Sequence, residues 1–159
     1  MTALARPGDG LLHPVALVAL VALVVNDQLL KAAWPGPVTG ILSDIAGLVV
    51  APLALQAIWE VATWTAGRCT GPSRRVLATA IIAVGVGFAL LQLWPPATEA
   101  YRIGLGALQW PFAALAAALA GSAPPAARPV VAVGDIEDVL ALPALLVSWW
   151  AGAARVRGH

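Results

Sequence analysis

The sequence predicts an all-α integral membrane protein, a four-helix bundle with an amphipathic helix on its outer face between the third and fourth spans. Hydrophobic residues make up 60% of the 159 residues and charged residues only 11%, which is more apolar surface than a soluble core of this size can bury. Four apolar runs, each long enough to cross a bilayer, account for most of the chain. We therefore expect a single membrane domain over residues 1-159.

The first two predicted spans, 11-31 and 38-60, form a hairpin. The apolar run of the first span leads into a polar end, Asn26 to Lys31, where lipid headgroups can solvate the charges. Pro35, Gly36 and Pro37 then force a tight connection, and Thr39 can cap the second helix.

The third and fourth predicted spans are 76-94 and 135-154. The third follows a loop with three arginines and no acid, and it ends at Pro95 and Pro96. The fourth begins at Asp135 and contains Pro143, which should bend it because proline has no amide to donate.

The segment 97-128 is predicted to be an extracytoplasmic amphipathic segment. Its run 103-121 is apolar enough to cross a bilayer, but Gln109, Trp110 and Pro111 lie near the middle, where a spanning helix tolerates them poorly. A short extended piece is expected at 128-133. The alternative is a five-span protein in which this run crosses the membrane.

Charge and tryptophan placement orient the four-span arrangement. Six arginines fall on one side (Arg6, Arg68, Arg74, Arg75, Arg155 and Arg157), and Lys31, Arg102 and Arg128 fall on the other. Because basic residues favour the cytoplasmic side, both termini are expected in the cytoplasm. Tryptophans gather at both ends of the predicted spans, as in interfacial belts: Trp34, Trp94 and Trp110 outside, and Trp59, Trp64, Trp149 and Trp150 inside.

Polar residues from separate spans are expected at one depth near the outer face. Carboxylate and hydroxyl oxygens are ligands for hard cations, and carboxylates within a membrane also pass protons. The sequence thus indicates a cation-binding or polar cluster, formed by Asp27, Lys31, Ser43, Asp44, Asp135 and Asp138. It identifies neither a cofactor nor the ion, and a bound cation is the only ligand we expect.

Structural interpretations stand beside this one. Asp27 and Lys31 are four residues apart and can form an intrahelical pair. Asp135 and Asp138 open a helix, where acids cap free amides. Asp44 lies inside an apolar helix, where a charge is costly unless it is paired, and Lys31 is the obvious partner. Glu60, near the inner belt, is interpreted as interfacial.

Small residues indicate where helices approach one another closely. Gly40 and Gly47 lie on one stripe of the second span, and Gly85 and Gly87 lie in the third. We expect this stripe to face protein.

Four segments carry a resemblance to a known group: NDQLLK (26-31), TGILSDIAGLVVAPL (39-53), ALQWPF (107-112) and DIEDVLALPALL (135-146). With them the chain resembles a group of small bacterial four-span membrane proteins. The resemblance implies a multi-pass protein of the bacterial inner membrane, and it implies no reaction, substrate or partner.

We therefore expect a non-enzymatic protein that binds or conducts a small cation through its outer carboxylates. Its partners would be the lipid bilayer and either further copies of itself in a homo-oligomer or a larger membrane complex. The alternative is a structural subunit or assembly factor of such a complex. A net charge of +1 gives no reason to expect nucleic acid, and the single cysteine, Cys69, excludes an internal disulfide. An enzyme would need a nucleophile or ligand set that the sequence does not display.

Overall fold

The computed structural model describes residues 7–68 and 71–156, and each regular element in these ranges is a helix. The all-α class is thereby confirmed for the described residues. Five helical segments are long and apolar enough to cross a membrane, judged by length and composition. Arg6, Cys69 and Arg157 lie outside the described residues. The chain divides into two units, one formed by residues up to Gly87 and from Asp138 onward, the other by Phe88–Glu137.

The first apolar run of the chain forms a helix with a wide turn near its end. A 3-10 turn, η1 (Asp9–Leu12), precedes α1 (Pro14–Val25). The imidazole Nδ1 of His13 accepts the Val15 amide at 3.3 Å and so caps α1, whose first residue is proline. The π-helical turn η2 (Asn26–Leu30) and the short α2 (Lys31–Ala33) continue this helix.

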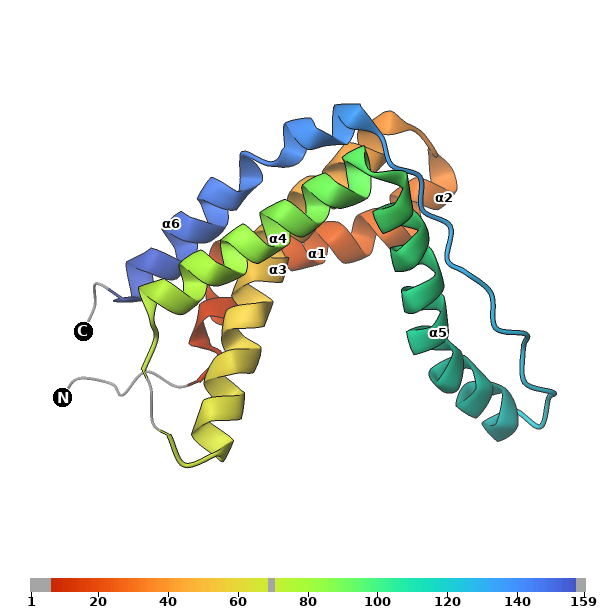
Figure 1. Ribbon diagram of the computed structural model, residues 1–159, viewed down its shortest axis with the longest axis horizontal. Helices are drawn as coiled ribbons and strands as arrows, with labels where there is room; N and C mark the ends of the chain where they lie inside the picture. The colour runs from red at the N-terminus through yellow and green to blue at the C-terminus, as the bar shows by residue number, and fades with distance from the viewer. Residues whose placement is uncertain (1–6, 69–70, 157–159) are drawn as a thin grey trace. The chain divides into compact units, whose positions relative to one another are not determined.

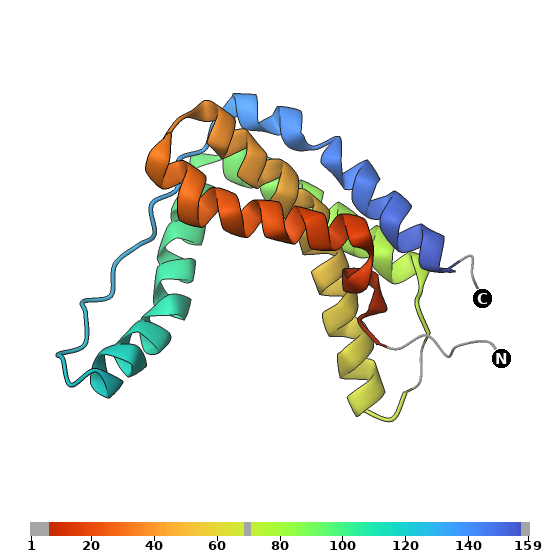
Figure 2. The same ribbon diagram turned by 180° about the vertical axis from the view of Figure 1, so that it is seen from behind.

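The second helix, α3 (Pro37–Thr65), is the longest in the structure and contains Pro52. Proline has no amide hydrogen, so the carbonyl of Leu48, four residues earlier, loses its helical partner. Ser148 of α6 (Ala144–Val156) supplies a replacement, because its hydroxyl donates to the carbonyls of Leu48 and Val49 at 2.9 Å each. Figures 1 and 2 show that α3 bends along its length, as expected of a helix with an internal proline.

The core of the first unit draws a residue from each of four helices. Ala16 of α1, Leu53 of α3, Leu77 of α4 (Arg74–Leu93) and Ala151 of α6 form one buried apolar cluster. Figures 1 and 2 show α1, α3, α4 and α6 lying beside one another. Each of these helices also exposes large apolar side chains, which is the surface expected of helices that contact lipid.

Two glycines let α4 and α6 approach each other. A Cβ added at Gly85 would lie 2.8 Å from a methyl of Leu145, and one at Gly152 would lie 2.6 Å from a methyl of Leu77. Residue numbers rise along α4 from Leu77 to Gly85, whereas the residues they contact on α6 fall from Gly152 to Leu145. The two helices are therefore antiparallel.

The last predicted span is divided into two helices, whereas the sequence predicted one bent helix. The structure forms a 3-10 helix, η3 (Ile136–Ala141), and a separate α-helix, α6, which begins after Pro143. The amides of Leu142, Leu145 and Leu146 donate to carbonyls three residues earlier, so the chain keeps short-range hydrogen bonds through the break. Pro143 ends the regular helix because it removes an amide and crowds the preceding turn.

The second unit consists of a helix and a segment that returns along it. Helix α5 (Pro95–Leu119) runs unbroken through Pro111, although the sequence predicted that a spanning helix would tolerate this position poorly. Residues 122–135 are extended and return beside the helix: the Val130 amide donates to the Arg102 carbonyl at 3.0 Å, and the Trp110 indole donates to the Pro125 carbonyl at 2.8 Å. The segment then reaches the end of α4, where the amide of Asp135 donates to Gln92 Oε1 at 3.0 Å.

Candidate functional site

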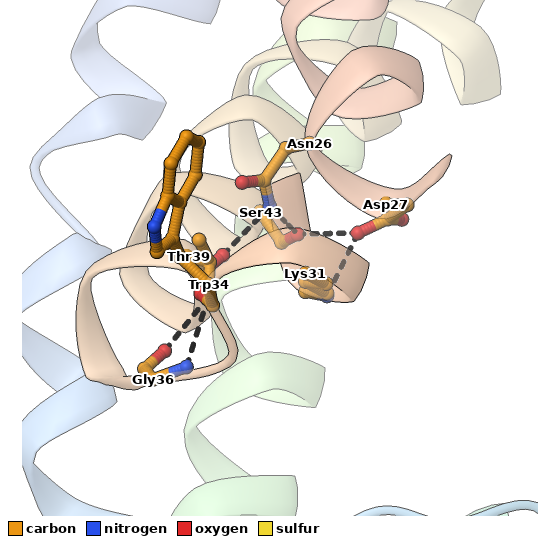
Figure 3. A network of polar contacts seen from close by, with 7 residues as sticks. All are labelled: Asn26, Asp27, Lys31, Trp34, Gly36, Thr39 and Ser43. Carbon is orange, nitrogen blue, oxygen red and sulfur yellow. Dashed lines mark hydrogen bonds and ion pairs between the residues drawn. The ribbon is translucent and has the colours of Figure 1, made fainter. Parts of the chain in front are cut away.

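A network of polar contacts joins the end of the first helix to the start of α3 (Figure 3). Asn26 lies at its centre and has no exposed surface. Its side-chain amide donates to the Thr39 carbonyl and to the Ser43 hydroxyl, both at 2.7 Å. Inside an apolar protein such bonds hold the two helices at one register, because neither group has water as an alternative partner.

The network continues from Ser43 toward the surface. The Ser43 hydroxyl donates to Asp27 Oδ1 at 2.6 Å, and the same oxygen contacts Lys31 Nζ at 2.7 Å. The side chains of Asp27 and Lys31 are 41% and 42% exposed, so their attraction is weakened by solvent. The structure thus shows Lys31 paired with Asp27 of its own helix and not with Asp44.

A π-helical turn carries Asn26 and Asp27, the two neighbouring residues that both contact Ser43. In η2 the Lys31 amide bonds to the Asn26 carbonyl, five residues earlier, so the turn holds one residue more than an α-helical turn. Figure 3 shows the Asn26 amide oxygen turned away from Asp27 and its amide nitrogen directed to α3. Turns of this kind occur frequently at functional sites.

Thr39 closes the connection between the two helices. Its hydroxyl donates to the Gly36 carbonyl at 2.9 Å and accepts the Gly36 amide at 3.3 Å (Figure 3). These bonds satisfy backbone groups before α3, the role predicted for Thr39 as a cap.

Three of the predicted carboxylates interact at this end of the first unit. Asp44, the residue after Ser43, is half-buried. It lies within electrostatic range of Asp138 and Asp27, which repel a negative charge there, and of Lys31, which attracts it. The first helix, α3 and η3 therefore contribute acids to one region. This region, formed by Asn26, Asp27, Lys31, Ser43, Asp44 and Asp138, is called the acidic cluster below.

Asp135 has a different role. Its carboxylate accepts the backbone amide of Glu137 at 3.0 Å, so it caps the first turn of η3. It belongs to the second unit, whereas the acidic cluster belongs to the first.

Two buried oxygen atoms in the described residues have no hydrogen-bond partner: Asn26 Oδ1 and Gln56 Oε1. A buried acceptor without a partner costs about 1–3 kcal/mol unless a water or a cation completes it. Asn26 is not among the predicted ligands, yet it is the buried centre of the cluster. Its position at the end of a long apolar run, where a polar residue is expensive, is the sequence signal that identifies it.

Glu60, interpreted from the sequence as interfacial, is buried by the protein itself. Glu60 is 6% exposed, and its carboxylate accepts the amide of Gly8 at 3.0 Å and the side-chain amide of Gln56 at 2.9 Å. These contacts tie the segment before α1 to the second half of α3. His13, the N-cap residue of α1, and Trp150 of α6 meet edge to face, with ring centroids 5.4 Å apart.

Of the four glycines predicted for helix packing, one lies against another helix of this chain. Gly85 is in contact with Leu145, but a Cβ at Gly40, Gly47 or Gly87 would meet no atom within 4 Å. Close approaches occur instead at Gly106, Gly134 and Gly152, which the sequence did not single out.

No family model, curated protein or solved structure matches the chain. Its long apolar helices and the polar network between two of them are features of a helical membrane protein.

Replacing Ser43 with alanine should lower the free energy of unfolding by about 1 kcal/mol, because it removes the bond to Asp27 and leaves the Asn26 amide with one acceptor fewer. Thermal unfolding in detergent measures this. Ser122→Ala is the matched control, since the Ser122 hydroxyl is exposed and donates only to the Ala117 carbonyl at 3.2 Å. Equal effects of the two substitutions would show that the network adds no stability.

Proposed function

We propose that the chain is a four-span inner-membrane protein of bacteria whose acidic cluster lies near the outer face and binds a small cation. In this arrangement the spans are α1 with its continuation to Ala33, α3, α4, and η3 with α6. Helix α5 and its return segment do not cross the membrane and lie on its outer side, and both termini are cytoplasmic.

The path of the second unit supports four spans over five. Asp135 returns to Gln92, at the end of α4 from which α5 departs. If α5 crossed the bilayer, the extended segment 122–135 would have to cross back beside it. Backbone amides and carbonyls of an extended chain have no partners in lipid, and each unpaired group costs several kcal/mol. Residues 97–128 are therefore better placed on one side of the membrane.

The charges support the orientation. The connection between α3 and the start of α4 contains three arginines, Arg68, Arg74 and Arg75. The acidic cluster lies at the other end of α3. Basic residues favour the cytoplasmic side, so the cluster and the second unit face outward.

Cation binding is carried by one observation: Asp44 lies within electrostatic range of Asp138 and Asp27, and Lys31 is the base whose charge opposes theirs. Lys31 itself contacts Asp27. Two acids from different helices then repel each other in a weakly polar environment, where charge is expensive. A cation or a shared proton between them relieves this repulsion.

The arrangement favours a monovalent ion or a proton over a tightly held divalent metal. Within the described ranges, no three side chains of His, Cys, Asp or Glu are grouped so that they can hold a metal ion together. Calcium sites need six to eight oxygen ligands, most of them from the protein. Oligomerisation would let several copies of the cluster surround one pathway.

The test is the thermal unfolding of the purified chain in lipid nanodiscs under different salts at constant ionic strength, with choline as the inert cation. We expect sodium, potassium or a lower pH to raise the transition temperature of wild type. Asp44→Asn should abolish this rise and leave the protein folded. Glu99→Gln, which removes an exposed acid paired with Arg102 in the second unit, should leave the rise intact. A wild-type transition that is the same in all salts and at all pH values would exclude cation binding.

A second candidate is a structural subunit or assembly factor of a larger membrane complex. The open space beside Gly40, Gly47 and Gly87 favours it, because small residues without neighbours let a helix of another chain approach closely. This function predicts co-purification of a stoichiometric membrane partner that is lost when Gly47 is replaced by leucine. Purification as a chain without other subunits would count against it.

A further inference from the structure

The return segment covers one face of α5. Arg102, Gly106 and Trp110 are spaced four residues apart and so lie along one side of the helix. Arg102 Nε donates to the Val130 carbonyl at 3.1 Å, and the Trp110 indole donates to Pro125. Between them, Gly106 is the buried residue of the helix, and a Cβ there would collide with the Arg128 carbonyl oxygen.

The opposite face of α5 is apolar and uncovered in this chain. At 100° per residue, the positions most remote from Arg102, Gly106 and Trp110 include four large apolar side chains. They are 58–81% exposed and are called the lipid face below: Leu108, Phe112, Leu115 and Leu119.

The charges of the second unit lie away from this face. Glu99 and Arg102 pair near the start of α5 at 2.9 Å, and the next charged residue along the chain is Arg128 on the return segment. The helix from Ile103 to its end thus offers no charged group to a polar partner, whereas apolar surface of this extent calls for an apolar one.

We propose that α5 lies in the outer headgroup layer of the membrane, with the lipid face among the acyl chains and the return segment toward water. This inference rests on the four-span topology proposed above. Only Trp94 separates α4 from α5, so in this topology α5 starts at the membrane surface, where α4 ends. Trp94 and Tyr101 are exposed aromatic residues near this junction, the type that anchors a helix at an interface.

The return segment fits the water side. Pro124, Pro125 and Pro129 favour an extended conformation whose backbone is solvated, and the segment from 121 to 129 is exposed throughout. A helix with a solvated strand on one face and large apolar residues on the other is suited to a boundary between water and lipid.

Spin labels test the proposal. Single cysteines replace Leu108, Leu115, Ser122 or Ile82 in a Cys69→Ser background, and the proteins are reconstituted singly into nanodiscs of phosphatidylethanolamine and phosphatidylglycerol. Collisions with oxygen report on lipid, and collisions with a nickel chelate report on water. We expect the labels at Leu108 and Leu115 to meet the chelate several-fold less often than the label at Ser122 does. The label at Ile82, an exposed apolar position of α4, is the reference for lipid.

Chelate access at Leu115 equal to that at Ser122 would overturn the lipid face. Protection of Leu115 from both oxygen and the chelate would also overturn it, since that is the signature of a protein contact. A distinct result concerns topology and is measured in sealed cells in place of nanodiscs: an impermeant thiol reagent should reach the Ser122 cysteine from the outside only. Reaction from the cytoplasmic side only would show that α5 crosses the membrane and would refute the proposed topology, whereas a failed lipid face with outside reaction would leave that topology standing.

The wild-type chain provides a measurement that needs no substitution. A phospholipid with a photoreactive diazirine near its headgroup should label 103–119 and spare 122–134. Absence of label from 103–119 would contradict the proposal.

Discussion

Replacing Ser148 with alanine is expected to destabilise the protein by about 1–2 kcal/mol. The Ser148 side chain is completely buried and donates to the Leu48 and Val49 carbonyls of α3. The Leu48 carbonyl has no helical donor, because the residue four positions later is Pro52. The substitution therefore leaves an unpaired carbonyl between two packed helices, in a region where water is scarce.

A double-mutant cycle separates this mechanism from a general loss of packing. Pro52→Ala restores an amide that can bond to the Leu48 carbonyl within α3, so Ser148→Ala should cost markedly less in that background. The measurement is reversible unfolding in mixed micelles for wild type, the two single variants and the double variant. Equal costs of Ser148→Ala in both backgrounds would show that the hydroxyl does not compensate for the proline.

Two alanine substitutions in α5 are expected to have opposite effects. Gly106→Ala should detach the return segment, because its Cβ would overlap the Arg128 carbonyl oxygen and lie 3.0 Å from the Cα of Pro129. These are backbone atoms and cannot move aside by a rotamer change. Gly104→Ala meets no atom within 4 Å, and alanine there should strengthen the helix by up to about 1 kcal/mol.

Nuclear magnetic resonance measures both outcomes. The Val130 amide donates to Arg102, and the Trp110 indole donates to Pro125, so each provides a reporter on the return segment. In Gly106→Ala the Val130 amide should exchange with solvent far faster, and the Trp110 indole resonance should shift. In Gly104→Ala both should stay as in wild type. An unchanged Val130 exchange rate in Gly106→Ala would contradict the observed approach of the two segments.

The sequence predicted the helices well where a long apolar run is bounded by prolines or charges. Pro35 to Pro37 separate the first two apolar runs, and α3 accordingly begins at Pro37. The basic residues at 74 and 75 and the prolines at 95 and 96 mark the ends of α4. Such boundaries are local, since a proline or a charge changes the cost of a helix in lipid wherever it stands.

The contacts between helices could not be predicted in the same way. The bonds from Ser148 to α3 join residues about a hundred positions apart, and no periodicity in either helix indicates which serine faces which carbonyl. Glycines illustrate the same limit: Gly106 and Gly152 touch neighbours, whereas Gly40 and Gly47 do not. In the acidic cluster, the residue types were predicted, but the central position of Asn26 depends on a π-helical turn that composition does not reveal.

That turn has a consequence for chain length. A π-helical turn is an α-helical turn with one inserted residue, so deleting a single leucine from Asn26–Leu30 would return the helix to its regular repeat. Everything beyond the deletion would then rotate by about 100° and shift by about 1.5 Å relative to Asn26. Lys31 and the connection to α3 would then point in a different direction, although no polar residue had been removed. The contacts within the acidic cluster therefore depend on the spacing of its residues along the chain as much as on their chemistry.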